Sequence, residues 1–413
     1  MKILYLHQYF LTPQMAGATR SYEMARRLVE RGHEVHMITS RGEGGRAGWT
    51  CTDEAGIRVH WCSVPYSNRM GYARRIWAFM RFSVMAARRA AAVSGDVVFA
   101  SSTPLTIALP AVYAAEKLSV PMVFEVRDLW PDTPIGVGAL KNRGVIATAR
   151  WLERFAYRNA AHVVALSPDM KTGVVSTGYP ADRVTVVPNG SDLELFRVAN
   201  GLAVEFRRSY DWLGDRPLVV YTGTLGVVNG VDYLARLAAV VGRIDPEVRF
   251  LTVGTGREEA KVRQTAEALG VLGRSFFMLP QIPKAEMPAV LSAADLATST
   301  VIDREQLWAN SANKVFDALA ADRPIVINHR GWLAEMIEQT GCGLVLNPNE
   351  TETAAEQLVA ALRNPLWVAR ARAAARKAAE ERFSRDLLFE RLETVLRRVV
   401  PEPQQQQQRR LAA

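Results

Sequence analysis

The stretch SANKVFDALAADRPIVI, residues 311–327, joins a helical pattern to a short apolar strand through Arg323 and Pro324. The same alternation of apolar strands and helical segments runs from one end of the chain to the other. A first series of strands is expected in KILYL (2–6), EVHMIT (34–39), DVVFAS (96–101), PMVFEV (121–126), AHVVALS (161–167) and RVTVVP (183–188). A second series is expected in PLVVYTG (217–223), VRFLTVG (248–254), SFFMLP (275–280), ADLATS (294–299), RPIVI (323–327) and GLVLN (343–347). Continuous apolar strands separated by helices predict parallel sheets that are covered on both faces.

The length of the chain indicates two domains, because 413 residues exceed what one ordinary hydrophobic core holds. The two series of strands separate near residues 190–216. They predict an α/β protein of two Rossmann-like, doubly wound parallel-sheet domains that face a central cleft, with ligands at the carboxyl ends of the strands. The last residues, PEPQQQQQRRLAA (401–413), are a low-complexity segment that we expect to be a disordered tail.

The composition is that of a folded enzyme or binding protein, with 49% hydrophobic and 23% charged residues. The apolar runs fall short of the roughly 18–20 residues that cross a bilayer, and MKILYLHQYF predicts a first strand instead of a signal peptide. Cys51, Cys62 and Cys342 offer neither a disulfide framework nor the spacing of a metal site. This pattern favours the reducing cytoplasm.

Positive charge is concentrated in the first half of the chain. Residues 1–200 carry 24 Lys and Arg against 16 Asp and Glu, whereas the remaining residues carry 27 against 26. The first half therefore contributes +8 of the net charge of +9, and we expect it to face an anionic partner or a membrane. A solvated basic face without a partner is the alternative.

The start of the stretch at 311–327 has the features of an anion site. If Ser311 caps a helix, the N–H groups of the first turn and the positive end of the helix dipole point outward, and Lys314 adds a full charge beside them. Asp317 lies one turn below Asn313 and could accept hydrogen bonds from sugar hydroxyls. A nucleoside diphosphate fits this combination. The alternative is a capped surface helix with an incidental lysine.

Two glycine-rich turns in the same half support a nucleotide site. YTGTLGVVNG (221–230) and TVGTGREEA (252–260) both run from a strand through glycines into a helix, the second with a G-x-G at Gly254 and Gly256. Together with the turn at 311–315, they would open at one edge of the sheet and form a cradle for a nucleotide.

Two segments in the first half are expected at the carboxyl edge of their own sheet. The long loop after the first strand, in HQYFLTPQMAGATRSYEMA (7–25), contains Gly17 and leads to Arg20 at a helix start. FEVRDLWPDTPIG (124–136) ends a strand with Arg127, Asp128 and Trp130. A simple turn and an ion pair that closes the strand are the alternatives. The turn VVPNGSDLELF (186–196) is interpreted as the hinge between the domains.

The segment GYARRIWAFMRFSVMAARRAA (71–91) has the pattern of a helix that lies on a membrane surface. Arg74, Arg81 and Arg88 recur two helical turns apart and are joined by Arg75 and Arg89 beside aromatic and methionine side chains. A core-packing helix with a solvated arginine edge is the alternative.

Several motifs are absent from the sequence. The chain has no D-x-D pair to hold a metal–diphosphate complex, and the nearest sequence is Asp303-Arg304-Glu305. It also lacks H-E-x-x-H, cysteine pairs and G-x-S-x-G, and no G-x-G-x-x-G follows the first strand as in nicotinamide dehydrogenases. We therefore expect no metal and no cofactor, with a departing diphosphate met by Lys314 and helix-start N–H groups.

Across nearly its whole length the chain resembles glycosyltransferase family 4, the retaining GT-B enzymes. The motifs that carry the resemblance are GATRSYEMARRLVERGHEV, VVPNGSD, YTGTLG, TVGTGRE and SANKVFDALAADRPIV. FEVRDLWPDTPI is similar to the branch that builds O-antigens and capsules, near the L-fucosamine transferases. The resemblance implies an acceptor-side domain at 1–198, a nucleotide-sugar domain at 199–385 and a helix at 386–400 that crosses back to the first domain.

The resemblance also implies roles for individual residues. Ser311, Asn313 and Lys314 would contact the donor diphosphate, with Gly223 and Thr224 facing it. Asp317 matches the second acid of the family's E-x7-E motif, which binds the donor ribose, whereas the first acid falls on Ala309. Asn229 stands where a lysine is usual, and Arg127 stands where many members have a histidine facing the acceptor. The residues expected on the acceptor side are Gly17, Arg20, Arg127, Asp128 and Trp130. Lys314, Arg127 and Asp128 are the expected catalytic residues.

The expected function is a metal-independent, retaining transfer of a hexose or aminosugar from a nucleoside-diphosphate sugar, with UDP favoured. The expected acceptor is a polyprenyl-diphosphate-linked or other cell-surface glycan, in O-antigen, capsule or exopolysaccharide assembly. We expect a cytoplasmic protein that attaches peripherally to the inner face of the cytoplasmic membrane and has no nucleic-acid partner. A GT-B nucleotide-sugar epimerase and a non-catalytic nucleotide-sugar-binding scaffold are the alternatives.

Overall fold

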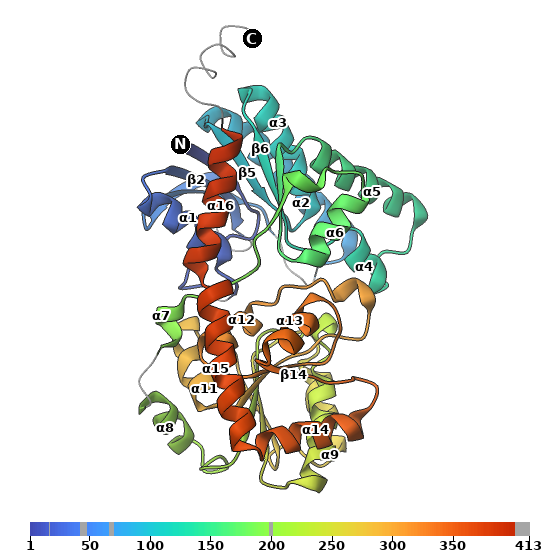
Figure 1. The fold of residues 1–413 in the computed structure, drawn as a ribbon. Helices are drawn as coiled ribbons and strands as arrows, with labels where there is room; N and C mark the ends of the chain where they lie inside the picture. The colour runs from blue at the N-terminus through green and yellow to red at the C-terminus, as the bar shows by residue number, and fades with distance from the viewer. Residues whose placement is uncertain (16, 42–47, 66–69, 198–200, 401–413) are drawn as a thin grey trace. The chain divides into compact units, whose positions relative to one another are not determined.

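The computed structural model describes residues 1–15, 17–41, 48–65, 70–197 and 201–400 (Figure 1). The chain forms two compact units: unit 1 contains Met1–Pro188 and the residues from Phe389 onward, and unit 2 contains Asn189–Leu388. The expected domain boundary at 198/199 and the expected disordered tail at 401–413 lie outside the described residues. No helix among the described residues is both long and apolar enough to span a bilayer.

Unit 1 is built on an eight-stranded sheet in the order β3-β4-β2-β1-β5-β6-β7-β8. Its strands are β1 (Lys2–Leu6), β2 (Glu34–Arg41), β3 (Trp49–Glu54), β4 (Ile57–Ser63), β5 (Val97–Ser101), β6 (Met122–Val126), β7 (His162–Ala165) and β8 (Val184–Val186). All neighbours are parallel except β3 and β4, which form an antiparallel hairpin at one edge that we did not predict. The strand order reverses between β1 and β5, where ligands of doubly wound sheets bind.

The helices of unit 1 connect these strands and pack on the sheet. They are α1 (Arg20–Glu30), α2 (Tyr72–Val93), α3 (Ala108–Leu118), α4 (Asp132–Gly136), α5 (Arg143–Arg158) and α6 (Pro168–Ser176). α3 packs on β5 and β6 and lies between α2 and α5. The helix expected to begin at Arg20, after the loop that follows the first strand, is therefore present as α1, and the arginine-rich helix is present as α2.

Unit 2 has a six-stranded, fully parallel sheet in the order β11-β10-β9-β12-β13-β14. Its strands are β9 (Leu218–Thr222), β10 (Arg249–Val253), β11 (Phe276–Leu279), β12 (Leu296–Ser299), β13 (Ile325–Ile327) and β14 (Gly343–Val345). This is the doubly wound order, with its switch point between β9 and β12. Every strand of the second expected series is present, and with the six in unit 1 the predicted α/β fold class is confirmed.

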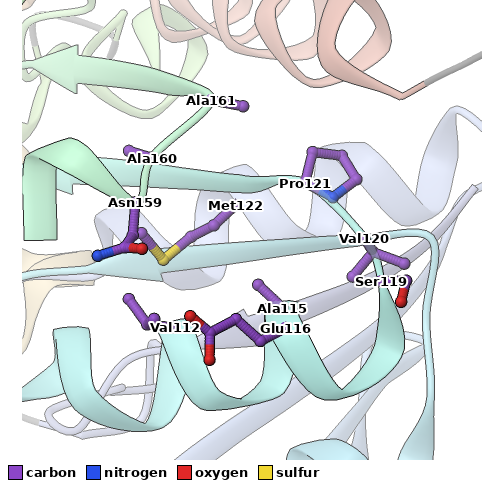
Figure 2. Close-up of a pocket in the computed structure, with 10 residues that line it drawn as sticks. All are labelled: Val112, Ala115, Glu116, Ser119, Val120, Pro121, Met122, Asn159, Ala160 and Ala161. Carbon is purple, nitrogen blue, oxygen red and sulfur yellow. The ribbon is translucent and has the colours of Figure 1, made fainter. Parts of the chain in front are cut away.

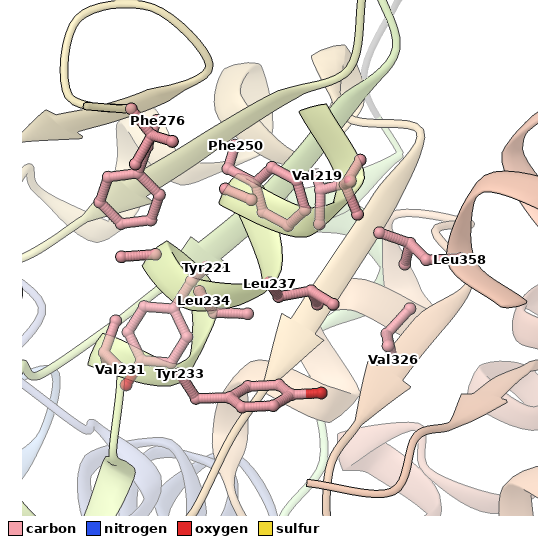
Figure 3. Close-up of a cluster of buried hydrophobic side chains, with 14 of the residues drawn as sticks. Val219, Tyr221, Val231, Tyr233, Leu234, Leu237, Phe250, Phe276, Val326 and Leu358 are labelled. Carbon is pink, nitrogen blue, oxygen red and sulfur yellow. The ribbon is translucent and has the colours of Figure 1, made fainter. Parts of the chain in front are cut away.

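The core of unit 2 explains why its strands are continuous apolar runs. Its helices are α7 (Leu193–Phe196), α8 (Gly201–Arg208), α9 (Asp232–Ile244), α10 (Glu259–Ala268), α11 (Met287–Ala293), α12 (Asn313–Ala320), α13 (Trp332–Thr340), α14 (Thr351–Leu362) and α15 (Pro365–Arg382). Val219 and Phe250 of the sheet pack against Leu234 and Leu237 of α9, and Leu358 of α14 belongs to the same buried cluster (Figure 3). Burial of these side chains fixes the sheet edge from which the loops described below extend.

The last helix, α16 (Arg385–Val399), begins in unit 2 and continues in unit 1 from Phe389 onward. Within unit 1, Glu393 Oε1 lies 3.0 Å from Nε2 of the buried His33, and Arg397 forms an ion pair with the same carboxylate. These contacts attach α16 to the start of β2.

Candidate functional site

In unit 2, Lys314 lies at the edge of the sheet where the strands end. Its Nζ donates a 3.0 Å hydrogen bond to Tyr221 Oη and lies 4.4 Å from the centroid of the Tyr221 ring. Tyr221 belongs to β9, so the ammonium group is held beside the switch point of the sheet. A Cβ on Gly223, the residue after β9, would lie 3.0 Å from Lys314 Cε. Glycine therefore lets the main chain after β9 approach the lysine.

The turns after β9 and β10 support each other through their main chains. Gly223 N donates to Val253 O at 2.9 Å, and Leu225 N donates to Thr255 O at 2.9 Å. A Cβ on Gly254 would lie 1.9 Å from Gly223 O. The same holds for Gly256, because a Cβ added there would lie 2.3 Å from the carbonyl oxygen of Leu225. These two glycines therefore hold the Gly223 turn in place, while the exposed Thr224 stands at its tip.

The predicted cap of the lysine-bearing helix is wrong. Helix α12 begins at Asn313 after Ala312, which provides no side-chain cap. Ser311 Oγ instead accepts a 3.1 Å hydrogen bond from Asn189 N, and the Asn189 side-chain amide donates to Ser311 O. The serine is engaged by a segment far away in the sequence, and the N–H groups at the start of α12 have no side-chain partner from the cap residue. This arrangement keeps the helix start available to an anion.

Asp317 lies one turn into α12 and is half-buried. Its Oδ1 accepts a 2.7 Å hydrogen bond from Oγ of the buried Ser191. Ser191 follows Asn189 in the turn that we predicted as a hinge, and the division between the two units falls between Pro188 and Asn189. Ser191 of this turn therefore contacts helix α12, and Asn189 contacts Ser311 just before it. No local sequence pattern predicts these contacts.

In unit 1, His7 and Arg127 meet where strands β1 and β6 end, and Ser21 of α1 lies beside them. His7, directly after β1, is buried, and its Nε2 accepts a 3.1 Å hydrogen bond from Arg127 Nη1. Its Nδ1 lies 2.9 Å from Ser21 Oγ. Burial and the neighbouring Arg127 guanidinium hold the pKa of His7 well below its usual value, so the ring is neutral. His7 is a candidate that we did not predict, although its place directly after the first strand was a usable signal.

Asp128 follows Arg127 at the end of β6. Its Oδ2 accepts a 3.4 Å hydrogen bond from Thr103 Oγ1. Burial raises the pKa of Asp128 above its usual value, while the Arg127 guanidinium opposes that shift. The predicted pair of Arg127 and Asp128 therefore lies at the expected sheet edge, with Trp130 half-buried two residues further on.

The prediction that Arg20 contacts an acceptor is wrong, because its side chain has no exposed surface. Its Nη2 lies 2.9 Å from Glu125 Oε1, and its guanidinium also donates to Val187 O and Pro188 O. Burial alone would raise the pKa of Glu125, but Arg20 and other neighbours outweigh it and lower that pKa. Arg20 therefore holds the end of the sheet together.

Gly17 lies in the loop before α1 and adopts a φ of +138°. A Cβ at this position would lie 2.5 Å from Leu11 Cδ1. The glycine is thus required by the fold of the loop itself, and a ligand role for it stays a prediction.

Helix α2 has features of both structures considered for it, a helix on a membrane surface and a core-packing helix with a solvated arginine edge. Its Ala78, Phe82 and Ala86 are buried against the rest of unit 1. On its other side Trp77 and Val84 are 63% and 51% exposed. The exposed arginines are Arg74, Arg81 and Arg88, whereas Arg75 is half-buried. The guanidinium of Arg81 lies 5.4 Å from the centroid of the Trp77 ring. The helix therefore packs on the core and also presents a basic and aromatic surface.

One cavity lies at the amino edge of the sheet in unit 1 and another at the carboxyl edge of the sheet in unit 2. One of about 390 Å³ in unit 1 lies beside Ser119, Pro121 and Met122, at the amino end of β6 (Figure 2). That edge is opposite to the one at which doubly wound sheets bind ligands. Another of about 480 Å³ lies in unit 2 at the carboxyl ends of β13 and β14. No group of three or more His, Cys, Asp or Glu within the described residues is arranged to hold a metal ion.

Comparison with known protein families agrees with this architecture. Residues 16–190 match the glycosyl transferase 4-like domain, and residues 216–364 match the domain of the glycosyl transferases group 1. The chain belongs to the GT-B glycosyltransferases. The first matched region contains strands β2 to β8 of the unit 1 sheet, and the second contains strands β9 to β14.

Two relatives support the same assignment. The chain is 26% identical to WcaI of Escherichia coli (strain K12), described as a colanic acid biosynthesis glycosyl transferase, over 410 residues that cover 94% of this chain and 97% of WcaI. It is 25% identical to the glycosyltransferase WbjE of Pseudomonas aeruginosa over 69% of this chain and 71% of WbjE.

Among solved structures, the Anabaena protein HepE in complex with UDP-glucose has the same fold. The TM-score is 0.71 at 18% sequence identity, and the match covers 96% of this chain and 99% of HepE. At this identity the likeness concerns the fold alone.

Proposed function

We propose that this glycosyltransferase moves a hexose or aminosugar from a UDP-linked donor to a lipid-linked glycan, with retention of the anomeric configuration. The observation that carries the proposal is the position of Lys314, held over Tyr221 beside Gly223 at the start of α12. A cation next to helix-start N–H groups is suited to the charge that develops on a departing diphosphate. The proposal requires no divalent ion, since these groups neutralise the leaving group themselves.

In the proposal, residues at the carboxyl edge of the unit 2 sheet bind the donor, and residues at the carboxyl edge of the unit 1 sheet act on the acceptor. Lys314, Asn313 and the Gly223–Thr224 turn bind the diphosphate, supported from behind by Gly254 and Gly256. Asp317 faces the ribose. Arg127, Asp128 and the neutral His7 act on the acceptor side, where His7 Nε2 is already bound to Arg127. Ser311 positions the start of α12 through Asn189.

The relatives favour a role in cell-surface polysaccharide assembly. WcaI is described as a glycosyl transferase of colanic acid biosynthesis. The motif FEVRDLWPDTPI resembles the branch of enzymes that builds O-antigens and capsules, near the L-fucosamine transferases. HepE binds UDP-glucose with a similar fold, which is why UDP is the proposed donor nucleotide. We extend both features to this chain as part of the proposal.

A transfer assay tests this function. The purified protein is incubated with UDP-glucose, UDP-galactose or UDP-N-acetylglucosamine and a polyprenyl-diphosphate-linked sugar, with and without EDTA. The expected result is an extended lipid-linked glycan whose new linkage keeps the donor's anomeric configuration by NMR, at an unchanged rate in EDTA. Conversion of the donor to an epimer without any acceptor, or complete loss of transfer in EDTA, would contradict the proposal.

We also propose that α2 attaches the protein to the cytoplasmic face of the membrane. Its exposed Trp77 and Val84 lie among the exposed Arg74, Arg81 and Arg88, the combination that binds anionic interfaces. Each arginine near such a surface contributes about 1 kcal/mol.

Flotation with vesicles containing anionic lipid tests the contact. Replacing Arg74, Arg81 and Arg88 together by glutamate is expected to weaken binding by about a hundredfold or more, from about 1 kcal/mol per lost charge. The matched control reverses three exposed arginines of unit 2: Arg263, Arg274 and Arg370. Equal loss in both variants would mean that net charge alone, and not α2, governs binding.

A further inference from the structure

Lys314 and Asp317 lie three positions apart on α12, so their side chains are neighbours on the surface of the helix. Side chains of opposite charge at this spacing attract each other and stabilise a helix when they pair. Pairing would be of particular benefit here, because Lys314 lies in the first turn, where the positive end of the helix dipole disfavours a cation. Within the residues that the structure describes, however, neither side chain forms an ion pair, and each is bound by a hydroxyl group instead.

The hydroxyl group that binds Lys314 belongs to Tyr221. Lys314 Nζ donates a 3.0 Å hydrogen bond to Tyr221 Oη, which donates its own proton to Thr224 O at 2.9 Å. The two bonds fix the phenol group and hold the ammonium group beside β9. Because a hydroxyl group that donates its proton to a carbonyl is neutral, the positive charge of Lys314 is not neutralised by this contact.

The hydroxyl group that binds Asp317 belongs to Ser191, which is only 1% exposed. Its Oγ donates a 2.7 Å hydrogen bond to Asp317 Oδ1. A buried hydroxyl needs a partner within the protein, and a carboxylate is a strong acceptor for it. The bond therefore fixes one carboxylate oxygen on the side of α12 that faces the turn at 189–192.

The turn that carries Ser191 is itself fixed within unit 2. Ser191 N donates to Phe383 O at 3.2 Å, and Arg385 N donates to Ser191 O at 3.0 Å. A Cβ on Gly190 would lie 2.5 Å from Phe383 O, so the two segments pack closely. Arg385, which is 2% exposed, donates to Asp192 Oδ2 at 2.9 Å. These contacts keep the serine hydroxyl in one place, and the hydroxyl in turn keeps the carboxylate there.

We propose that Ser191 is a positioning residue that holds the Asp317 carboxylate away from Lys314, so that the charge of the lysine stays available to a diphosphate. The inference rests on the proposed function, in which Lys314 binds the diphosphate of the donor. Without the serine hydroxyl, Asp317 is free to pair with Lys314, and a phosphate must first break that ion pair. Ser191 acts through the acid and does not itself touch the ligand.

Calorimetry with inorganic pyrophosphate and with UDP, in the absence of divalent ions, tests this role. Pyrophosphate carries the charges that Lys314 is proposed to bind and has no ribose, so it reports on the diphosphate contact alone. The variants are Ser191→Ala, Asp317→Asn and the double variant Ser191→Ala/Asp317→Asn. Ser292→Ala is the matched control, because it removes a partly buried hydroxyl that donates to Ala289 O of its own helix at 3.0 Å.

Ser191→Ala is expected to weaken the binding of pyrophosphate and of UDP by about fivefold, because the ligand must first break an ion pair of up to about 1 kcal/mol. Asp317→Asn leaves no acid to compete for Lys314 and should bind pyrophosphate at least as tightly as the wild type. The double variant should bind it as tightly as Asp317→Asn, and Ser292→Ala should behave as the wild type. A hydroxyl that only stabilised the turn would give no such recovery in the double variant.

The outcomes separate this inference from the proposed function. Unchanged pyrophosphate affinity in Ser191→Ala, or a double variant that binds as weakly as Ser191→Ala, would overturn the positioning role alone. Failure of the wild type to bind UDP, or unchanged UDP affinity in Lys314→Met, would overturn the proposed function. Should Ser191→Ala fail to fold, Ser191→Cys, whose thiol is only a weak donor, takes its place in the same comparison.

Discussion

Replacing Lys314 with methionine removes the cation that the proposed reaction requires and keeps an unbranched side chain. In the folded protein the ammonium group makes one 3.0 Å hydrogen bond and one ring contact, both to Tyr221. Their loss amounts to about 1–2 kcal/mol of stability, from typical values for a hydrogen bond and a cation–π contact. Loss of one charge-stabilising group from the transition state costs about 3 kcal/mol, or about a hundredfold in kcat. Catalysis should therefore fall much further than stability.

The assay is release of UDP at saturating donor and acceptor, with thermal unfolding recorded for each variant. Lys314→Arg keeps the charge and should retain more activity than Lys314→Met. Tyr221→Phe is the matched control, because it removes the hydroxyl partner and keeps the ring beneath the ammonium group. Its expected loss is about fivefold, from one hydrogen bond of about 1 kcal/mol. A Lys314→Met variant that folds and keeps kcat within threefold of the wild type would refute the electrostatic reasoning.

Three further predictions concern the frame of the two units. Gly254→Ala places a Cβ 1.9 Å from a carbonyl oxygen, so it should destabilise unit 2 by about 1–3 kcal/mol and weaken UDP binding. The control is Gly201→Ala, whose new Cβ would meet nothing within 4 Å. It should change neither the melting temperature nor the affinity for UDP. Arg20→Met leaves Glu125 buried without its ion-pair partner and should cost about 3–5 kcal/mol in denaturant unfolding; normal stability with a raised KM for acceptor would restore the ligand role rejected above. Burial, with a neighbouring carboxylate, raises the pKa of Glu153 to about 7, so stability should fall as pH rises from about 4 to 7. Glu153→Gln should therefore gain about 3 kcal/mol at pH 8 and almost nothing at pH 4. A constant difference between wild type and Glu153→Gln from pH 4 to 8 would contradict that assignment.

The parallel strands were predictable because each is buried on both faces and therefore forms a continuous apolar run. All twelve predicted strands are present, with six in each unit. The hairpin of β3 and β4 was missed because it lies at the sheet edge, where WTCTDE alternates polar and apolar residues. The glycine at position 56, between the two strands, was the local signal that could have revealed the turn. In the structure Ala55 and Gly56 adopt φ of 54° and 80°.

The candidate site was predictable only where the evidence was local. Lys314, in the first turn of a helical run, is such a case. The roles of Ser311 and Arg20 were not, because their partners Asn189 and Glu125 lie 122 and 105 residues away in the sequence. A serine before a helix is normally its cap, and an arginine at a helix start is normally exposed. Only the folded chain shows that one is held by a distant turn and the other is buried in an ion pair.

His329 and Trp308 carry the same lesson in another form. Neither belongs to a motif, and each is notable only because the folded chain buries one of its polar atoms without a partner among the described residues. Local sequence patterns report which residues start and end elements, whereas the satisfaction of buried polar groups depends on the whole fold.

The most direct test of the account is a crystal structure of the protein with UDP. We predict that phosphate oxygens lie within about 3 Å of Lys314 Nζ, a hydrogen-bond distance, beside the main chain of Gly223 and the first N–H groups of α12. A UDP molecule bound elsewhere, or one whose phosphates reach the protein only through a divalent ion, would contradict it.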